Sequence, residues 1–204
     1  MKRLLIVLLL AGGGYYYHTQ SNSVSFDPNA EVLLFTNEVC KKPCKDARKY
    51  LDRRVSFTEV VVEQEGENWK LFQDHGGKNT LPVIAIGKSS LQGFNPMEVT
   101  TTLAQVLGTD ALSNNERAAY EAHFDAEGEP IVVMYATRTC GYCIRAREYF
   151  EANNVAYTER DIDRSKSARR NFETLWGGGT PLIFNGYRRM NGFNERKIDA
   201  VLDL

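Results

Sequence analysis

The stretch IVVMYATRTCGYC, residues 131–143, decides the interpretation of this chain. Its first six residues are an apolar run rich in β-branched side chains, which is typical of a strand buried on both faces. Cys140 and Cys143 follow, and after them comes an amphipathic segment that predicts a helix. The two sulfurs therefore lie at the amino end of a helix, close enough for a disulfide.

Two cysteines at such a position favour redox chemistry. The helix dipole and its unpaired backbone N–H groups stabilise a thiolate, and we expect Arg138, Arg145 and Arg147 to add to this effect. Cys140 would be the exposed nucleophile, and Cys143, one turn inside the helix, would be the resolving thiol. The alternatives are an inert disulfide or half of a zinc site. Zinc requires two more ligands, and residues 131–204 hold no histidine and no third cysteine.

The dipeptide Thr180-Pro181 supports the redox interpretation. A proline at the start of a strand cannot donate to the sheet, and a cis bond there would leave the preceding backbone free to pair with an extended substrate. Pro82, which follows Leu81, lies at the same distance from its own second cysteine. The alternative is that the proline only marks an edge strand. This alternative is weakened because both copies place a proline at the same position.

The chain contains an internal repeat. VLLFTNEVC (32–40) matches VVMYATRTC (132–140) at an offset of 100, whereas DARKYL (46–51) matches RAREYF (145–150) and QGFN (92–95) matches NGFN (191–194) at 99. We predict two copies of one α/β unit, at 31–107 and 131–204, each with the order β-α-β-α-β-β-α. A connector at 108–130 carries a helix with the capping box Ser113 and Glu116. Both copies are small, so we expect them to lean on each other or on the connector.

The cysteine pair of the first copy differs from that of the second. Lys41, Lys42 and Pro43 separate Cys40 from Cys44, so one residue is inserted inside the turn. Cys44 stays in register with the helix and Cys40 is displaced. The lysines favour a thiolate. Three interpretations stay open: an active dithiol, a structural or substrate-docking copy, and a soft-metal site.

The first residues form a targeting pattern. Lys2 and Arg3 precede the apolar run 4–11, which predicts a signal peptide or an N-terminal membrane anchor over residues 1–20. We therefore expect an exported protein, periplasmic or membrane-anchored. An apolar N-terminus on a cytoplasmic protein is the alternative.

Composition excludes several classes of protein. The 204 residues are 43% hydrophobic and 25% charged with a net charge of -1, so the chain is neither disordered nor a general binder of nucleic acid. Four cysteines are too few for a disulfide-rich scaffold.

Together these motifs resemble the thioredoxin superfamily, and residues 131–204 resemble a dithiol glutaredoxin over nearly their whole length. CGYC (140–143), TP (180–181) and NGFN (191–194) carry the resemblance. It implies two tandem thioredoxin-fold domains. Cys143 stands where the cluster-binding monothiol glutaredoxins have serine, which argues against iron–sulfur assembly. The resemblance also implies a glutathione or substrate surface, which we assign to Arg138, Tyr142, Thr180, Pro181, Gly192, Phe193 and Asn194, and to Leu81 and Pro82 in the first copy.

We therefore predict a thiol-disulfide oxidoreductase that reduces or exchanges disulfides through Cys140 and Cys143, with Cys40 and Cys44 as a divergent second pair. Its expected partners are a disulfide-containing protein or a glutathione mixed disulfide, together with a reductant protein. No bound cofactor or metal is expected, and glutathione is the candidate co-substrate. The alternative is an adaptor, or a metal chaperone resembling copper-handling C-x-x-x-C proteins, for which His75 is the candidate third ligand.

Overall fold

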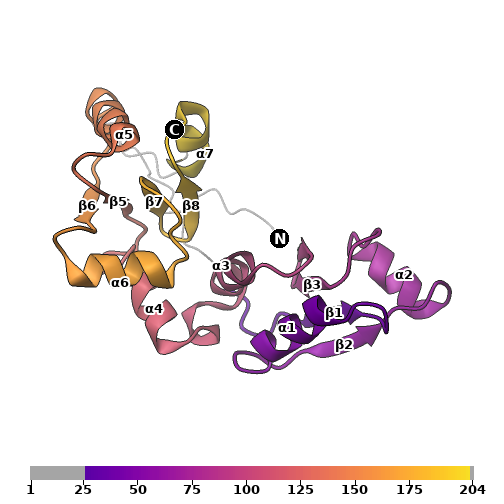
Figure 1. Cartoon of the computed structure of the whole chain (residues 1–204). Coiled ribbons are helices and arrows are strands. Elements are labelled where there is room, and N and C mark those ends of the chain that lie inside the picture. The colour runs from indigo at the N-terminus through magenta and orange to yellow at the C-terminus, as the bar shows by residue number, and fades with distance from the viewer. Residues whose placement is uncertain (1–25, 203–204) are drawn as a thin grey trace, which may run out of the picture.

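The computed structural model describes residues 26–202, and within this range it contains two four-stranded sheets (Figure 1). The first sheet has the order β2-β1-β3-β4 and is formed by β1 (Val32–Thr36), β2 (Thr58–Val61), β3 (Val83–Ile86) and β4 (Ser89–Gln92). Its helices are α1 (Lys42–Leu51), α2 (Glu67–Asp74) and α3 (Pro96–Leu107).

The second sheet has the equivalent order β6-β5-β7-β8. Its strands are β5 (Val132–Ala136), β6 (Thr158–Asp161), β7 (Leu182–Asn185) and β8 (Arg188–Asn191), and its helices are α5 (Gly141–Ala152), α6 (Lys166–Thr174) and α7 (Glu195–Leu202). A short 3-10 helix, η1 (Thr109–Ala111), and α4 (Asn114–Glu121) lie between the copies.

Strand pairing repeats between the copies. The first two strands of each are parallel, with Leu33 opposite Thr58 and Val133 opposite Thr158, and the remaining pairs are antiparallel. The order β-α-β-α-β-β-α predicted for each copy is therefore confirmed, and both copies have a thioredoxin-like fold. The central strands β1 and β5 are buried almost throughout, because helices cover both faces of each sheet.

Local signals begin several of these elements. The Asn95 side chain accepts from the Met97 N–H at 3.0 Å, and Pro96 follows as the first residue of α3. Ser113 and Glu116 form the predicted capping box of α4. Gly186 turns β7 into β8 with a φ of 56°, a conformation that favours glycine.

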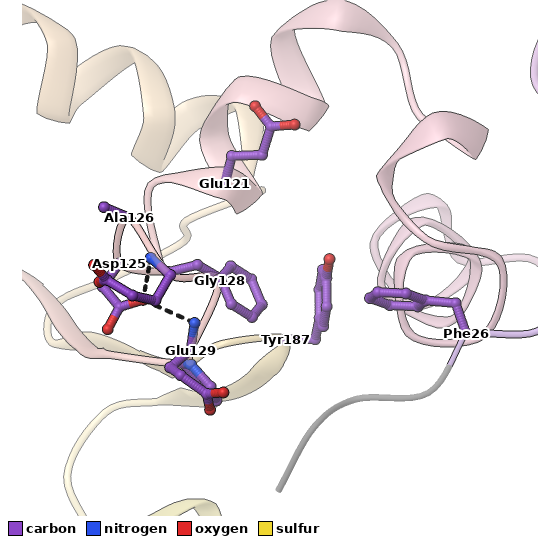
Figure 2. Close-up of a pocket in the computed structure, with 10 residues that line it drawn as sticks. Phe26, Glu121, Asp125, Ala126, Gly128, Glu129 and Tyr187 are labelled. Atoms are coloured by element: carbon purple, nitrogen blue, oxygen red, sulfur yellow. Dashed lines mark hydrogen bonds between the residues drawn. The ribbon is translucent and has the colours of Figure 1, made fainter. Parts of the chain in front are cut away.

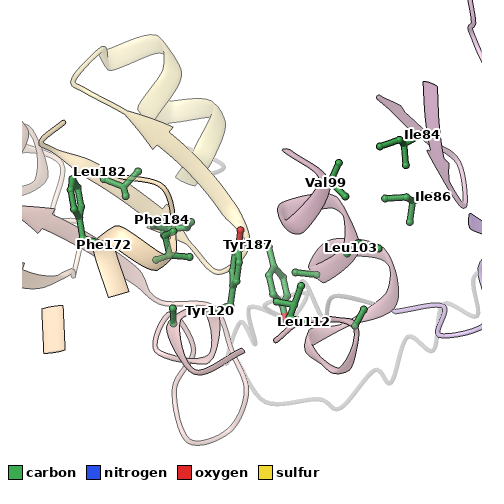
Figure 3. Packing of buried hydrophobic residues seen from close by; sticks show 14 of the residues in the cluster. Ile84, Ile86, Val99, Leu103, Leu112, Tyr120, Phe172, Leu182, Phe184 and Tyr187 are labelled. Carbon is green, nitrogen blue, oxygen red and sulfur yellow. The ribbon is translucent and has the colours of Figure 1, made fainter. Parts of the chain in front are cut away.

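A shared core joins the two copies (Figure 3). Its buried side chains come from the face of the first sheet beneath α1 and α3, from α4, and from the face of the second sheet beneath α6. Tyr120 of α4 packs edge-on against Phe184 of β7, and its hydroxyl lies 2.8 Å from Thr101 Oγ1 of α3. The expectation that the small copies lean on each other and on the connector is confirmed, since one core spans all three.

A buried ion pair adds to this contact. Arg54, just after α1, lies 2.7 Å from the Glu116 carboxylate of α4, and both side chains are largely buried. Burial alone would raise the pKa of Glu116, but hydrogen bonds from Ser113 and Arg54 lower it below its usual value.

The predicted leader at residues 1–20 lies outside the described residues. Within 26–202, no helix has the length and apolar character needed to cross a membrane. The limits 31–107, 108–130 and 131–204 stay predictions.

Candidate redox-active site

The second copy places its cysteine pair at the start of α5. Cys140 and Cys143 are disulfide-bonded, with their Cα atoms 5.2 Å apart. Cys140 is the N-cap residue of the helix and is partly exposed, whereas Cys143, its third residue, is fully buried. This is the asymmetry expected of an accessible attacking sulfur and a shielded resolving sulfur.

Two backbone groups surround the Cys140 sulfur. The Cys143 N–H donates to Cys140 Sγ at 3.0 Å, and the carbonyl oxygen of Thr180 lies 3.3 Å from the same sulfur. In the reduced protein the N–H and the positive end of the helix would both stabilise a thiolate. Thr180-Pro181, which carries the carbonyl, is a cis peptide, as the sequence suggested.

The three arginines make different contacts near this site. Arg147 donates to Glu159 of β6 at 2.8 and 2.7 Å, and this hydrogen bonding raises the pKa of Arg147. The same guanidinium donates to the Thr137 carbonyl at 3.3 Å, and support of the Cys140 thiolate by Arg147 stays a prediction. Arg138 is exposed just before the cysteines, and the Arg145 guanidinium lies over the Tyr142 ring at 4.3 Å.

The predicted substrate surface gathers beside Cys140. Gly192 donates its N–H to the Pro181 carbonyl at 2.8 Å, which holds the turn before α7 against the cis-proline loop. Phe193 packs beside Tyr149, and the Asn194 side chain accepts from the Lys197 N–H at 3.1 Å. Asn194 is therefore the N-cap of α7.

A shallow cavity of about 350 Å³ adjoins this surface. Phe193 and Asn194 line it together with Arg145, Glu195 and Arg196. Sequence analysis missed the last two, although their place directly after Asn194, in the first turn of the final helix, was a usable signal.

The first copy shows the effect of the inserted residue. Cys40 and Cys44 are disulfide-bonded with their Cα atoms 5.6 Å apart, and α1 begins at Lys42. Cys44 is thus the third helical residue, as Cys143 is in α5, while Cys40 lies one residue before the N-cap, Lys41. The predicted displacement of Cys40 and retention of Cys44 are confirmed.

A different residue positions Cys40. Its backbone N–H donates to the Asn37 side chain at 2.9 Å, and no side chain caps α1. Sequence analysis missed Asn37. The sequence feature that indicates this role is the spacing: an asparagine three residues before a cysteine can accept a hydrogen bond from the backbone N–H of that cysteine. Leu81-Pro82 is also a cis peptide, and Gly93 donates to the Pro82 carbonyl at 2.8 Å, as Gly192 does to Pro181.

His75, the candidate third ligand of the alternative metal site, has other contacts in this structure. Its Nδ1 lies 2.9 Å from the Leu71 carbonyl, and its ring packs beside Phe35. Across residues 26–202 no group of three or more histidine, cysteine or acidic side chains has an arrangement suited to a metal ion.

Comparisons with known proteins give the following similarities. Residues 132–187 match the family model for glutaredoxin. A Mycobacterium tuberculosis protein named as a glutaredoxin is 36% identical over 47 residues, which is 23% of this chain and 56% of that protein, so the chain spans only about half the length of this relative. A glutaredoxin-like protein of 8.6 kDa from Clostridium pasteurianum is 24% identical over 74 residues, 36% of this chain and 99% of that protein. Among solved structures, a glutaredoxin from Archaeoglobus fulgidus aligns with a TM-score of 0.33 and 24% identity, over 37% of this chain and 89% of that one.

Proposed function

Because this chain carries a glutaredoxin domain at residues 132–187, we propose that it is a thiol-disulfide oxidoreductase whose working pair is Cys140 and Cys143. The observation that carries the proposal is the Cys143 N–H, 3.0 Å from Cys140 Sγ at the start of α5. This N–H stabilises a thiolate at Cys140, which is partly exposed. The sulfur of Cys143 is buried and lies within bonding distance of Cys140 Sγ.

The proposed reaction has two exchange steps. The Cys140 thiolate attacks a substrate disulfide, forming a mixed disulfide and releasing one substrate thiolate. The Cys143 thiolate then attacks Cys140 Sγ, which releases the second substrate thiolate and leaves the Cys140–Cys143 disulfide. Two electrons pass to the substrate, and the released thiolates take up protons from water. A dithiol reductant protein or two glutathione molecules restore the reduced pair by the reverse exchange.

Substrate binding is assigned to the surface beside Cys140. The backbone at Thr180 is adjacent to the attacking sulfur, and the turn at Gly192 and Phe193 is held against the same loop. An extended peptide lying along Thr180 would bring its disulfide to Cys140. Tyr142 is 54% exposed and would contact the same substrate.

Export of the protein is a further proposal, supported by the pattern of Lys2, Arg3 and the apolar run after them. Fractionation of the native host tests it. Recovery of the chain in the soluble cytoplasmic fraction would contradict export.

Trapping tests the proposed roles. Cys143→Ser is expected to accumulate a mixed disulfide through Cys140, seen by mass spectrometry under non-reducing conditions, and Cys140→Ser is expected to abolish disulfide reduction. Cys44→Ser is the matched control, because it removes the sulfur at the same helical position in the first copy. Full dithiol activity in Cys140→Ser would exclude the assignment.

A further inference from the structure

A cavity of about 470 Å³ lies where the segment before the first copy, the connector and the second copy meet. Phe26 comes from the segment before β1, Glu121 from the end of α4, Tyr187 from the turn between β7 and β8, and residues 124–130 from the connector (Figure 2). None of these residues belongs to either cysteine site.

Aromatic rings form one wall of the cavity. The Tyr187 ring centre lies 4.7 Å from that of Phe124. It lies 5.7 Å from the ring centre of Phe26, which stands beside it in Figure 2. The faces of such rings attract organic cations.

Carboxylates form the rim. Glu121, Asp125, Glu127 and Glu129 line the cavity, and no lysine, arginine or histidine between residues 26 and 202 does. Asp125 accepts from the N–H groups of Glu127 and Glu129 at 3.0 and 2.8 Å, so its carboxylate holds the loop. Among residues 26–202, the other three carboxylates have no ion-pair partner. The rim therefore has a concentrated negative potential.

The Tyr187 hydroxyl is a second, independent indication of a ligand. Tyr187 is only 7% exposed, yet no residue in the described range hydrogen-bonds to its hydroxyl. Figure 2 shows the hydroxyl directed toward the side of the cavity where Glu121 stands. Burial, with Glu121 nearby, raises the pKa of Tyr187 to about 12, so the hydroxyl stays protonated. The hydroxyl is not among the buried polar atoms that lack a partner, so its oxygen is open to the cavity and accessible to a ligand there.

We propose that this cavity binds a guanidinium or alkylammonium cation. The cation lies against the aromatic wall, the carboxylates of Glu121, Glu127 and Glu129 neutralise its charge, and the Tyr187 hydroxyl hydrogen-bonds to it. Either a small organic cation or an arginine or lysine side chain of another polypeptide has this chemistry. The occupant would touch the segment before the first copy, the connector and the second copy at once.

Titration of the full chain by ¹H–¹⁵N NMR tests the proposal, with ethylguanidinium as the probe and ethylurea as its uncharged counterpart. Ethylguanidinium is expected to cause saturable shifts at the backbone amides of Gly128 and Gly186, and ethylurea is not. No saturable shift with ethylguanidinium, or equal shifts with both compounds, would overturn the proposal.

Two variants then test the carboxylate charges and the Tyr187 hydroxyl separately. Replacing Glu121, Glu127 and Glu129 together by glutamine is expected to weaken ethylguanidinium binding about tenfold, because three exposed attractions are lost. Asp125 is kept, since it holds the loop. Tyr187→Phe keeps the ring and is expected to weaken binding about threefold to tenfold through loss of the hydrogen bond. Binding unchanged in both variants would refute the site.

Residues 63–67, which lead into α2, offer a control with the same number of carboxylates. Glu63, Glu65 and Glu67 are exposed, and none of them lines the cavity. Replacing these three by glutamine changes the net charge by the same amount and is expected to leave ethylguanidinium binding unchanged. An equal loss in the control would mean that the cation responds only to net charge, which would overturn the proposal.

Two further probes identify the source of the cation. A peptide with one arginine that binds about tenfold more tightly than Nα-acetyl-arginine amide indicates a polypeptide partner, and equal affinity indicates a small molecule. Disulfide reduction is expected to be unchanged in the cavity variants. Failure of this proposal therefore leaves the proposed function of Cys140 and Cys143 standing, and the reverse also holds.

Discussion

Deleting Lys42 from the first copy should convert its displaced cysteine into a copy of the Cys140 site. The deletion leaves Cys40-Lys41-Pro43-Cys44, which restores the two-residue spacing and makes Cys40 the N-cap of α1. The Cys44 N–H would then donate to Cys40 Sγ, as the Cys143 N–H donates to Cys140 Sγ at 3.0 Å.

The size of the effect follows from that one contact. A hydrogen bond to a charged group contributes about 1.5–3 kcal/mol. Since 1.4 kcal/mol is a factor of ten, the thiolate-to-thiol ratio of Cys40 should rise about 10-fold to 100-fold at fixed pH. Removing a lysine would by itself lower this ratio, although Lys42 is already paired with Asp46 and contributes little. The two effects have opposite signs, so the direction of the change distinguishes them.

Ultraviolet absorbance of the thiolate measures the ratio in a chain whose other cysteines are replaced by serine. Serine at position 44 keeps the backbone N–H that matters. The reciprocal change, a lysine inserted between Gly141 and Tyr142, should lower the ratio for Cys140 by a similar factor. A thiolate fraction of Cys40 that falls or stays constant after the deletion would refute the register argument.

Three other predictions concern stability, each measured by denaturant unfolding. Gly177→Ala should cost about 1–3 kcal/mol, because the added Cβ would lie 2.4 Å from the Phe172 ring, while Gly178→Ala, with open space around its Cβ, should be nearly neutral. Glu116→Gln should cost about 3–5 kcal/mol, since it leaves a largely buried arginine without its partner; a cost near zero would contradict the role of this ion pair in joining the first copy to α4. Burial, followed by the charge of Arg160, lowers the pKa of His123 to about 3, so the unfolded chain binds a proton that the folded chain excludes. Stability should therefore fall as pH drops from about 6.5 toward about 3, and His123→Gln should flatten that slope; an unchanged slope would show that other groups carry it.

Local features of this protein could be predicted from sequence because short-range physics produces them. The buried strand before Cys140, the caps at Asn95 and Ser113 and the turn at Gly186 each depend on a few neighbouring residues. Aligning the two copies also located the inserted residue, because Cys44 had to remain in its helix for the rest of the copy to stay in register.

Pairing between distant side chains could not be predicted in the same way. Glu59 and Glu159 matched in the repeat, but their arginine partners on α1 and α5 became visible only in the fold. Sequence analysis therefore related Arg147 only to Cys140, and the fold showed its contact with Glu159.

The sequence by itself determined that two related α/β units follow one another and that the spacing of their cysteine pairs differs by one residue. These properties depend on residue order and helical spacing, which the chain carries along its length. Only the tertiary structure decided that the copies share a core through α4, and that three aromatic rings and four carboxylates from separate segments enclose a cavity. Such contacts arise because each copy is too small to bury all of its apolar surface alone. Apolar faces that are far apart in the chain therefore pack against each other.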